Sequence, residues 1–205
     1  MQESIEQVFG VDTERLLEIT GPVTGFQGTD LSLRELCRTL EEVGYFRPRN
    51  EVEEDPSFQQ LIPYVVLTCG PMVLLLERTA RGGEARLHGK LSIGVGGHVN
   101  PEPPGPEPLL VRGLRREVCE EIDLPDSGSL EPALLGFIRD PSNAVGRVHF
   151  GLACRIELPE PVAIREKETL IGRWVAPTEL PRCEERMETW SRFLHPFIGS
   201  VSASP

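Results

Sequence analysis

Hydrophobic residues along the chain gather in short unbroken runs that predict β-strands. Residues 62–69 and 72–77 are two such runs, and Gly70 with Pro71 separates them. Two apolar runs joined by a short turn of this kind are typical of a β-hairpin. Further strands are predicted at residues 91–99, 130–139, 148–158 and 170–175.

Helices are predicted where apolar residues recur at helical spacing. Leucine, valine and isoleucine repeat every four residues from Leu110 to Ile122, which predicts a helix over residues 107–122 with one buried face. Residues 184–198 carry a similar apolar stripe and are predicted to form the last helix. Strands around a central helix favour an α/β layered domain.

The first 57 residues are predicted to form an N-terminal extension packed on a core domain of residues 58–200. A capping-box pattern at Ser32 starts a helix predicted over residues 33–43. Residues 5–17 fit either a strand or short helical turns, and residues 50–55 are predicted to be an acidic linker.

The chain has 205 residues and a net charge of −11 at pH 7. It lacks the basic stripe that nonspecific nucleic-acid binding needs, so no nucleic-acid partner is expected. Five scattered cysteines without a C-x-x-C pair indicate reduced thiols. No stretch resembles a signal peptide or a membrane span. We therefore expect a cytoplasmic protein without membrane attachment, and its oligomeric state stays open, with a homodimer as one option.

A cluster of acids marks the predicted central helix. Residues 116–121 read Arg-Glu-Val-Cys-Glu-Glu, so Glu117, Glu120 and Glu121 stand at i, i+3 and i+4 and share one helix face. Like charges at this spacing repel unless a cation joins them, and Mg²⁺ is commonly shared between carboxylates and substrate phosphates. A solvated acidic face would explain the acids, but not the strand and the Gly96-Gly97 pair upstream. The pattern therefore predicts a metal-assisted phosphate site.

The same residues resemble the signature of the Nudix family, the MutT-like hydrolases. Arg116 to Leu124 match the second half of that signature, except that Asp123 replaces a glycine. Gly97 lies 19 positions before Arg116, where the signature has 14, so five residues are extra. Residues 55–64, 87–94 and 143–151 resemble one branch of the family, the predicted Nudix phosphoesterases.

The resemblance implies an α/β/α sandwich with a mixed β-sheet over residues 58–198, and it implies that residues 1–57 belong to the same fold unit. It also implies Mg²⁺ or Mn²⁺ as cofactor. The metal ligands would be Glu117, Glu120, Glu121 and the backbone carbonyl of Gly97, and Arg116 would orient the carboxylates. Glu117 would bind a further ion or act as general base.

The loop between the two halves of the signature is rich in proline. Residues 101–108 read Pro-Glu-Pro-Pro-Gly-Pro-Glu-Pro, and each proline fixes φ and removes a donor. Neither Glu102 nor Glu107 is in register for the first acid of the signature, so that acid is either replaced by one of them or absent. We expect so stiff a loop to have little freedom to reach inward.

Several residues are candidates for holding substrate. Arg78, Arg86 and Lys90 flank the strand that leads to Gly97 and could bind phosphate, although each also fits a solvated surface charge. His98 fits a substrate or metal contact as well as a structural turn. Glu168 or Glu166 fits an extra acid of the site as well as an exposed loop acid. His149 fits a partly buried histidine. Trp174 and Trp190 fit core residues as well as platforms on which a base stacks.

We expect a hydrolase of acid anhydrides, a pyrophosphatase or phosphoesterase. Its partner would be a small phosphorylated molecule, with the cleaved bond a phosphoanhydride in a nucleoside diphosphate derivative or a related organic pyrophosphate. Two alternatives stay open. One is a noncatalytic nucleotide-sensing or interaction module on the same fold, and the other is an isomerase of a diphosphate ester.

Overall fold

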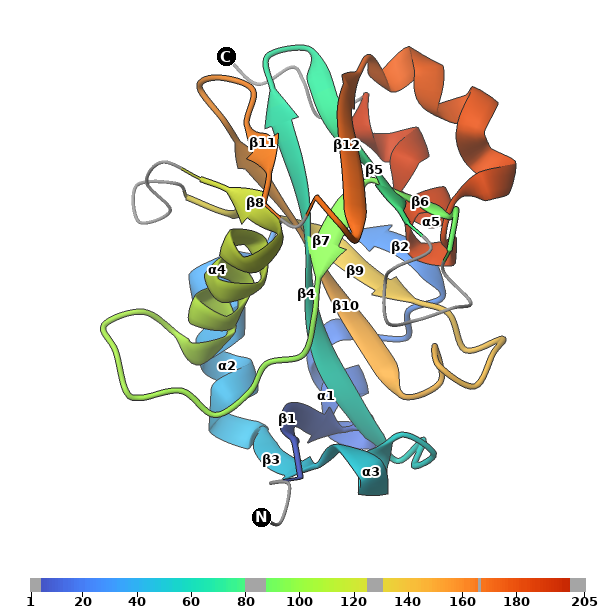
Figure 1. Ribbon diagram of the computed structural model, residues 1–205. Helices are drawn as coiled ribbons and strands as arrows, with labels where there is room; N and C mark the ends of the chain where they lie inside the picture. The colour runs from blue at the N-terminus through green and yellow to red at the C-terminus, as the bar shows by residue number, and fades with distance from the viewer. Residues whose placement is uncertain (1–4, 80–87, 125–130, 166, 200–205) are drawn as a thin grey trace.

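A long central strand organises the fold. The structure is a computed structural model that describes residues 5–79, 88–124, 131–165 and 167–199. Strand β4 (Phe58–Cys69) is buried along all but its last residue and lies at the centre of the molecule (Figure 1). The main path across the sheet runs β12 (Leu170–Val175), β5 (Met72–Arg78), β4, β10 (His149–Glu157), β9 (Ala133–Arg139) and β2 (Gly25–Gly28).

The sheet is mixed, because β10 runs parallel to β4 while the other neighbours along this path are antiparallel. The predicted hairpin of β4 and β5 is confirmed, and so are the strands β9, β10 and β12. A second, two-stranded sheet joins β8 (Ile122–Asp123) to β11 (Ala163–Ile164).

The strand predicted over residues 91–99 is interrupted. It divides into β6 (Leu91–Ser92), which pairs with β5, and β7 (Gly94–Gly96), which pairs with β4. The hydroxyl of Ser92 donates to the carbonyl of Gly94 and accepts from its N–H, at 2.7 and 3.2 Å. These local bonds replace ladder bonds, so the chain changes its partner strand at this point.

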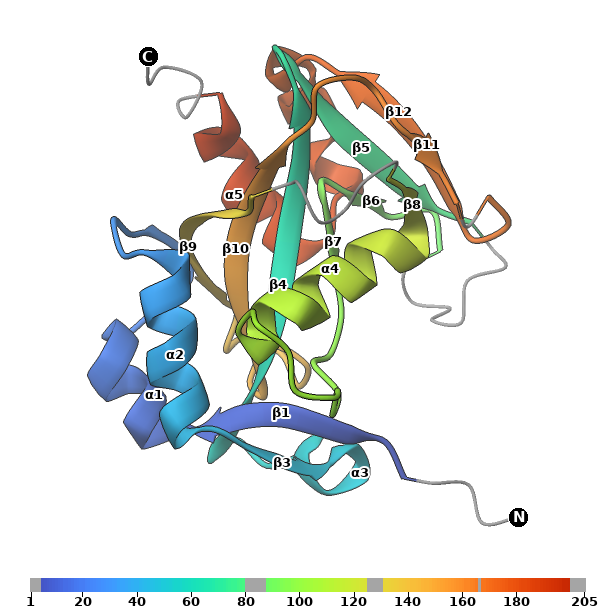
Figure 2. The ribbon, with the colours of Figure 1, turned by 90° about the vertical axis from the view of Figure 1, so that its left-hand side faces the viewer.

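Helices cover both faces of the sheet (Figure 2). On one face, α2 (Leu33–Val43) and α4 (Leu109–Glu121) pack on β4 residues such as Leu61 and Val65. On the other face, α5 (Thr189–Ile198) and the 3₁₀ helix η3 (Pro177–Arg186) pack against Tyr64 and Val66. Successive residues of a strand point to opposite faces, which is how one strand supplies both cores. The expected α/β/α sandwich is confirmed.

Three local predictions need correction. Ser32 precedes α2, but its side chain makes no capping hydrogen bond. The predicted acidic linker contains a short helix, α3 (Arg49–Val52). The last helix begins at Thr189 instead of residue 184, because Glu188 is extended and its N–H donates to the carbonyl of Leu91 at 2.9 Å.

Residues before Phe58 form several elements of the fold. The ambiguous segment 5–17 contains both a strand, β1 (Gln7–Asp12), and the start of a helix, α1 (Thr13–Thr20). Strand β1 pairs with β4 and with β3 (Tyr45–Pro48), and β2 extends the sheet beyond β9.

The N-terminal end of α4 depends on this segment. Pro108 precedes the helix and offers no capping side chain, while Glu41 of α2 accepts a hydrogen bond from the N–H of Leu110 at 3.0 Å. A carboxylate at this end satisfies a backbone donor and interacts favourably with the helix dipole. At its other end α4 passes directly into β8, so Asp123, at the glycine position of the signature, lies in a strand.

Two further observations concern the whole described chain. None of the five cysteines forms a disulfide. Within the described residues, no helix has both the length and the apolar character needed to cross a membrane.

Replacing Gly10 by alanine tests how firmly β1 is part of the fold. A Cβ atom there would lie 2.4 Å from the carbonyl oxygen of Gln59 and 2.5 Å from the Phe58 ring. We expect Gly10→Ala to lower the free energy of unfolding by about 1–3 kcal/mol, the usual cost of overpacking, in a single denaturant transition. Gly28→Ala is the matched control, because its Cβ would meet only the Leu135 carbonyl, at 3.7 Å. Equal stability of the two variants would contradict this prediction.

Candidate active site

Gly97 and Glu117 fit together closely at the start of the loop that leads to α4. A Cβ atom on Gly97 would lie 2.0 Å from Oε2 of Glu117, so only glycine leaves room for this carboxylate. The Glu117 side chain is largely buried, and burial raises its pKa, an effect that the charge of Arg116 partly offsets. The first half of the predicted site is therefore in contact with the second.

Arg116 links the acids of α4 to this loop. Its Nη1 lies 2.8 Å from Oε1 of Glu117 and 3.0 Å from Oε1 of Glu120. Its Nη2 donates to the carbonyl of His98 at 2.8 Å and to the side chain of Asn100 at 3.1 Å. Charge-assisted bonds of this kind fix orientation as well as contributing energy. Arg116 thus holds two carboxylates and two loop residues in one arrangement.

The proline-rich loop does reach this arrangement, contrary to our expectation. Oε1 of Glu102 accepts from Nε of Arg116 at 3.1 Å, and its other oxygen lies 3.6 Å from Arg112. Glu107 instead pairs with Arg115, at 3.0 Å. A stiff, proline-rich loop can still point one side chain inward, because the residues at the two ends of the loop set the path of its backbone.

Glu121 lies on the side of α4 that faces a cavity of about 820 Å³. One of its oxygens is 3.9 Å from Nη1 of Arg78, and Nε of Arg78 donates to Glu188 at 3.2 Å. All three side chains line the cavity. Glu188 carries no sequence signal of its own, and only the extended start of α5 brings it here.

His98 and His149 form a hydrogen-bonded pair in the same cavity, with their Nε2 atoms 3.1 Å apart. Nδ1 of His149 lies 2.7 Å from the carbonyl of Val145 and donates to it, so its Nε2 accepts from His98. Burial lowers the pKa of His98 to about 3, and the charge of Arg49 adds to this effect. His98 is therefore neutral at physiological pH, and His149 is the partly buried histidine that the sequence favours.

The N-terminal segment also supports the site, which the sequence did not indicate. The side chain of Asn100 donates to Glu6 at 3.0 Å and to the carbonyl of Gln7 at 2.9 Å, while its oxygen accepts from Arg116. The N–H of Phe9 donates to the carbonyl of Val99 at 2.8 Å. Residues 6–9 thereby fix the loop that carries Gly97.

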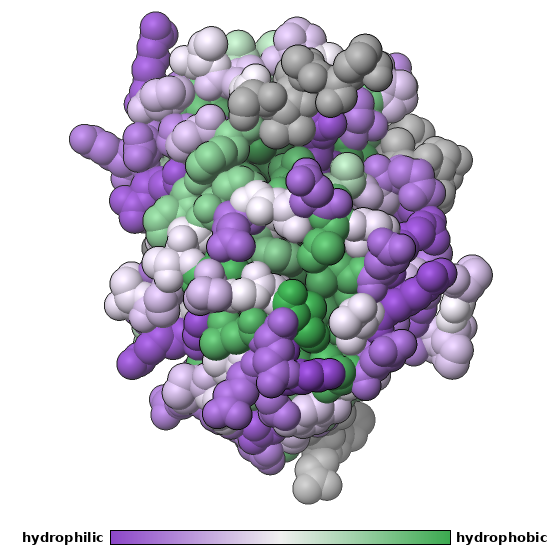
Figure 3. All heavy atoms as spheres, turned by 180° about the vertical axis from the view of Figure 1, so that it is seen from behind, coloured by the Kyte–Doolittle hydropathy of each residue, from purple (hydrophilic) through white to green (hydrophobic). Residues whose placement is uncertain are grey.

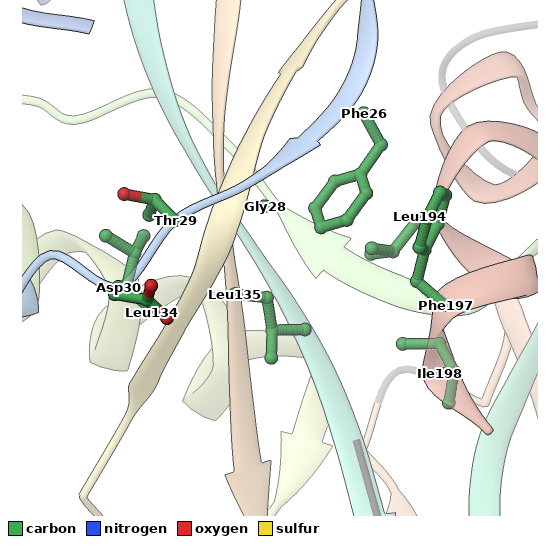
Figure 4. A pocket seen from close by; sticks show the side chains of 9 residues that line it. All are labelled: Phe26, Gly28, Thr29, Asp30, Leu134, Leu135, Leu194, Phe197 and Ile198. Carbon is green, nitrogen blue, oxygen red and sulfur yellow. The ribbon is translucent and has the colours of Figure 1, made fainter. Parts of the chain in front are cut away.

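Other predicted substrate contacts lie elsewhere. Lys90 is half-buried and Glu168 is exposed, and neither is among the residues that line the cavity. Arg86 and Glu166 lie outside the described residues. A second cavity of about 400 Å³ lies between β2, β9 and α5 (Figure 4), and it is lined by none of the predicted site residues.

The donor set suits a hard divalent cation. Glu117, Glu120, Glu121 and the carbonyl of Gly97 offer only oxygen, which Mg²⁺ and Mn²⁺ prefer. The close contact of Gly97 with Glu117 places a carboxylate beside the backbone of residue 97. As they stand, no three His, Cys, Asp or Glu side chains in the described parts of the chain converge on one point. Arg116 occupies two of the acids instead.

Comparison with known proteins identifies the family of the chain. The chain is 32% identical to Tm1382, a proposed Nudix hydrolase of known crystal structure, over 96% of this chain and all of that one, with a TM-score of 0.80. The chain belongs to the Nudix family.

Other relatives of this Nudix protein are less informative. Protein YmaB of Bacillus subtilis (strain 168) is 38% identical over 178 residues, which are 82% of this chain and 86% of that protein. DR0079 from Deinococcus radiodurans shares the fold, with 16% identity, a TM-score of 0.52, and coverage of 86% of this chain and 100% of that one. No model of a protein family matches the chain.

Gly97→Ala should disturb the site without unfolding this Nudix protein. The new methyl group displaces the end of the flexible Glu117 side chain, so we expect less than about 1 kcal/mol change in unfolding free energy. Any metal-dependent turnover should fall at least tenfold, about 1.4 kcal/mol of transition-state stabilisation. Gly199→Ala is the control, because its Cβ would meet only Pro177, at an ordinary 3.8 Å. Full activity in Gly97→Ala would show that the contact with Glu117 has no functional role.

The two loop acids should differ in effect. Glu102 contacts Arg116 and Glu107 does not. We expect Glu102→Gln to lower kcat/KM by up to about tenfold and Glu107→Gln by less than about threefold, which correspond to roughly 1.4 and 0.7 kcal/mol. Steady-state kinetics of both variants on one substrate would decide, and a larger loss for Glu107→Gln would refute the assignment.

Proposed function

We propose that this protein is a Mg²⁺- or Mn²⁺-dependent hydrolase that cleaves a phosphoanhydride bond in a nucleoside diphosphate derivative or a related organic pyrophosphate. One observation carries most of the proposal. Arg116 holds Glu117, Glu120 and the carbonyl of His98 together, next to a cavity large enough for such a molecule. A pure binding module has no need for three acids in this arrangement. Membership of the Nudix family supports the same reaction class.

The metal would be held by Glu117, Glu120, Glu121 and the carbonyl of Gly97. When bound, it would neutralise the charge of the diphosphate and activate water. These acids share one helix turn and repel one another, so a divalent cation gains from all of them. Arg116 keeps the carboxylates oriented through the bonds described above.

Other residues of the site bind the substrate or accept the proton of the attacking water. Arg78 and His98 line the cavity. Arg78 can donate to phosphate oxygens, while His98 already donates its Nε2 hydrogen to His149 and offers only an acceptor. Water attacks one phosphorus, the bond from that phosphorus to the bridging oxygen breaks, and the bridging oxygen leaves with the other phosphate. We assign the proton of the water to Glu117, because the contact with Gly97 holds its carboxylate in one position.

A substrate screen with metal control tests the reaction. Nucleoside diphosphate sugars, dinucleoside polyphosphates and nucleoside triphosphates are incubated with Mg²⁺ or Mn²⁺, and released monophosphate or phosphate is measured. We expect turnover of at least one class, loss of turnover in EDTA, and recovery when metal is added back. Undiminished turnover in chelator would refute the metal assignment. Metal-dependent binding without any turnover would indicate a nucleotide-sensing module instead.

Glu121→Gln and Glu120→Gln should separate function from folding. Each substitution removes a proposed ligand, so we expect kcat to fall about a hundredfold or more, roughly 2.7 kcal/mol. The melting temperature in metal-free buffer should stay the same or rise, because one of three like charges is removed. Glu42→Gln, the same change on an exposed position of α2, is the control. A large loss of stability in the two ligand variants would mean that these acids are structural.

A further inference from the structure

Trp190 presents a half-buried indole to the cavity that also holds Glu121, Arg78 and His98. Its six-membered ring lies over Gly151 of β10, where a Cβ atom would be 3.0 Å from Cζ3 and 3.1 Å from Cη2. Any side chain at position 151 would push the ring away. Glycine therefore lets the indole lie directly on the strand backbone.

A buried tyrosine holds the ring from another side. The rings of Tyr64 and Trp190 meet edge to face, with centroids 5.6 Å apart and an angle of 86° between their planes. The Tyr64 hydroxyl is 3.0 Å from Oγ of Ser92 and 2.8 Å from Oγ of Ser191, and Ser191 also accepts from the N–H of Ile93 at 3.0 Å. Burial raises the pKa of Tyr64, which keeps this hydroxyl protonated. The network ties the start of α5 to β4 and β6, so Trp190 has a fixed position.

The other tryptophan is placed differently. Trp174 of β12 packs against the apolar core on the face of the sheet that carries α2 and α4, and it does not line the cavity. Trp190 shares the cavity with the apolar side chains of Ile62, Val145 and Val148. These side chains give this part of the cavity an apolar wall.

A short series of contacts connects this apolar wall to the acidic helix. Glu188, two residues before Trp190, accepts from Arg78, and Arg78 lies 3.9 Å from Glu121. A single arginine side chain therefore spans from the start of α5 to the proposed metal site. One small molecule can contact both places, with its diphosphate at α4 and its other end at Trp190.

We propose that Trp190 stacks on the aromatic ring of the substrate and makes the protein select nucleobase-containing diphosphates over diphosphates without an aromatic group. This inference rests on the proposed function, because it places the diphosphate at α4. Stacking on a base is strong for an indole that is already held in place, since little conformational freedom is lost on binding. It is also tolerant of the base, because each base offers a flat face.

A fluorescence titration tests the stacking without requiring turnover. The chain has two tryptophans, so Trp174→Phe leaves Trp190 as the sole one. ADP, GDP, CDP and UDP are titrated in the presence of Mg²⁺, and inorganic pyrophosphate with Mg²⁺ serves as the matched anion without a base. We expect saturable quenching by at least one nucleoside diphosphate and none by pyrophosphate. Equal quenching by pyrophosphate, or no response to any of the four nucleotides, would overturn the inference.

Kinetics of Trp190 variants then separate specificity from a structural role. The two substrates are ADP-ribose and phosphoribosyl pyrophosphate, which has a diphosphate and a ribose but no base. We expect Trp190→Leu to raise KM for ADP-ribose about tenfold or more and to leave kcat/KM for phosphoribosyl pyrophosphate within twofold of wild type. Trp190→Phe should retain most of the affinity, and Trp174→Phe should change neither substrate. An equal loss on both substrates would show that Trp190 is merely structural.

The two proposals fail in different ways. If the wild-type protein hydrolyses neither of these compounds nor any compound of the substrate screen under any metal condition, the hydrolase assignment fails. The fluorescence titration then still decides whether Trp190 stacks on a base. If hydrolysis is metal-dependent but Trp190→Leu leaves KM for ADP-ribose unchanged, the stacking inference fails and the hydrolase assignment stands.

Discussion

The parallel pairing of β4 with β10 is the constraint on which the site depends. It places Gly151 opposite Ile62 and His149 opposite Gln60, while the other edge of β4 pairs Tyr64 with Gly96. One strand therefore fixes the positions of the glycine loop, the histidine pair and the surface on which Trp190 lies. Parallel strands need a long connection, and here that connection includes α4, the helix that carries the acids. The pairings along the two edges of β4 thus bring the acids and the aromatic wall together.

Electrostatic compensation is the second theme of the site. Three carboxylates within one helix turn would repel one another, and arginines on both sides of α4 compensate their charge. Arg116 contacts Glu117 and Glu120, and Arg78 lies between Glu121 and Glu188. Each of these arginines keeps contact with solvent, so the pairs offset the repulsion between the acids while contributing little net stability. A divalent cation would take over part of the role that the arginines have in the absence of metal.

Support for the site also comes from distant parts of the chain. Glu41 of α2 caps α4, and Glu6 with Gln7 fixes Asn100 beside Arg116. On the face seen from behind in Figure 3, apolar side chains gather in the middle with polar side chains around them. Among the described residues before Phe58, Arg49, Glu53 and Glu54 are the only ones that line the large cavity. The rest of this segment therefore acts on the site through positioning.

The sequence by itself determined the local elements and the chemistry of α4. The hairpin at Gly70, the stripe from Leu110 to Ile122 and the Arg-Glu-x-x-Glu-Glu spacing are properties of neighbouring residues, and local periodicity suffices to predict them. The family likeness followed from the same short stretch.

Only the tertiary structure decided which distant residues complete the site. The contact of Glu102 with Arg116 depends on the path of an inserted loop, and the places of Glu188 and Trp190 depend on an extended segment held by Leu91. The interruption of the strand at Ser92 and the capping of α4 by Glu41 likewise arise from partners far apart in the chain. Sequence periodicity reports which face of an element is buried, but it contains no information about which distant side chain meets that face, because register and loop path are set by packing of the whole domain.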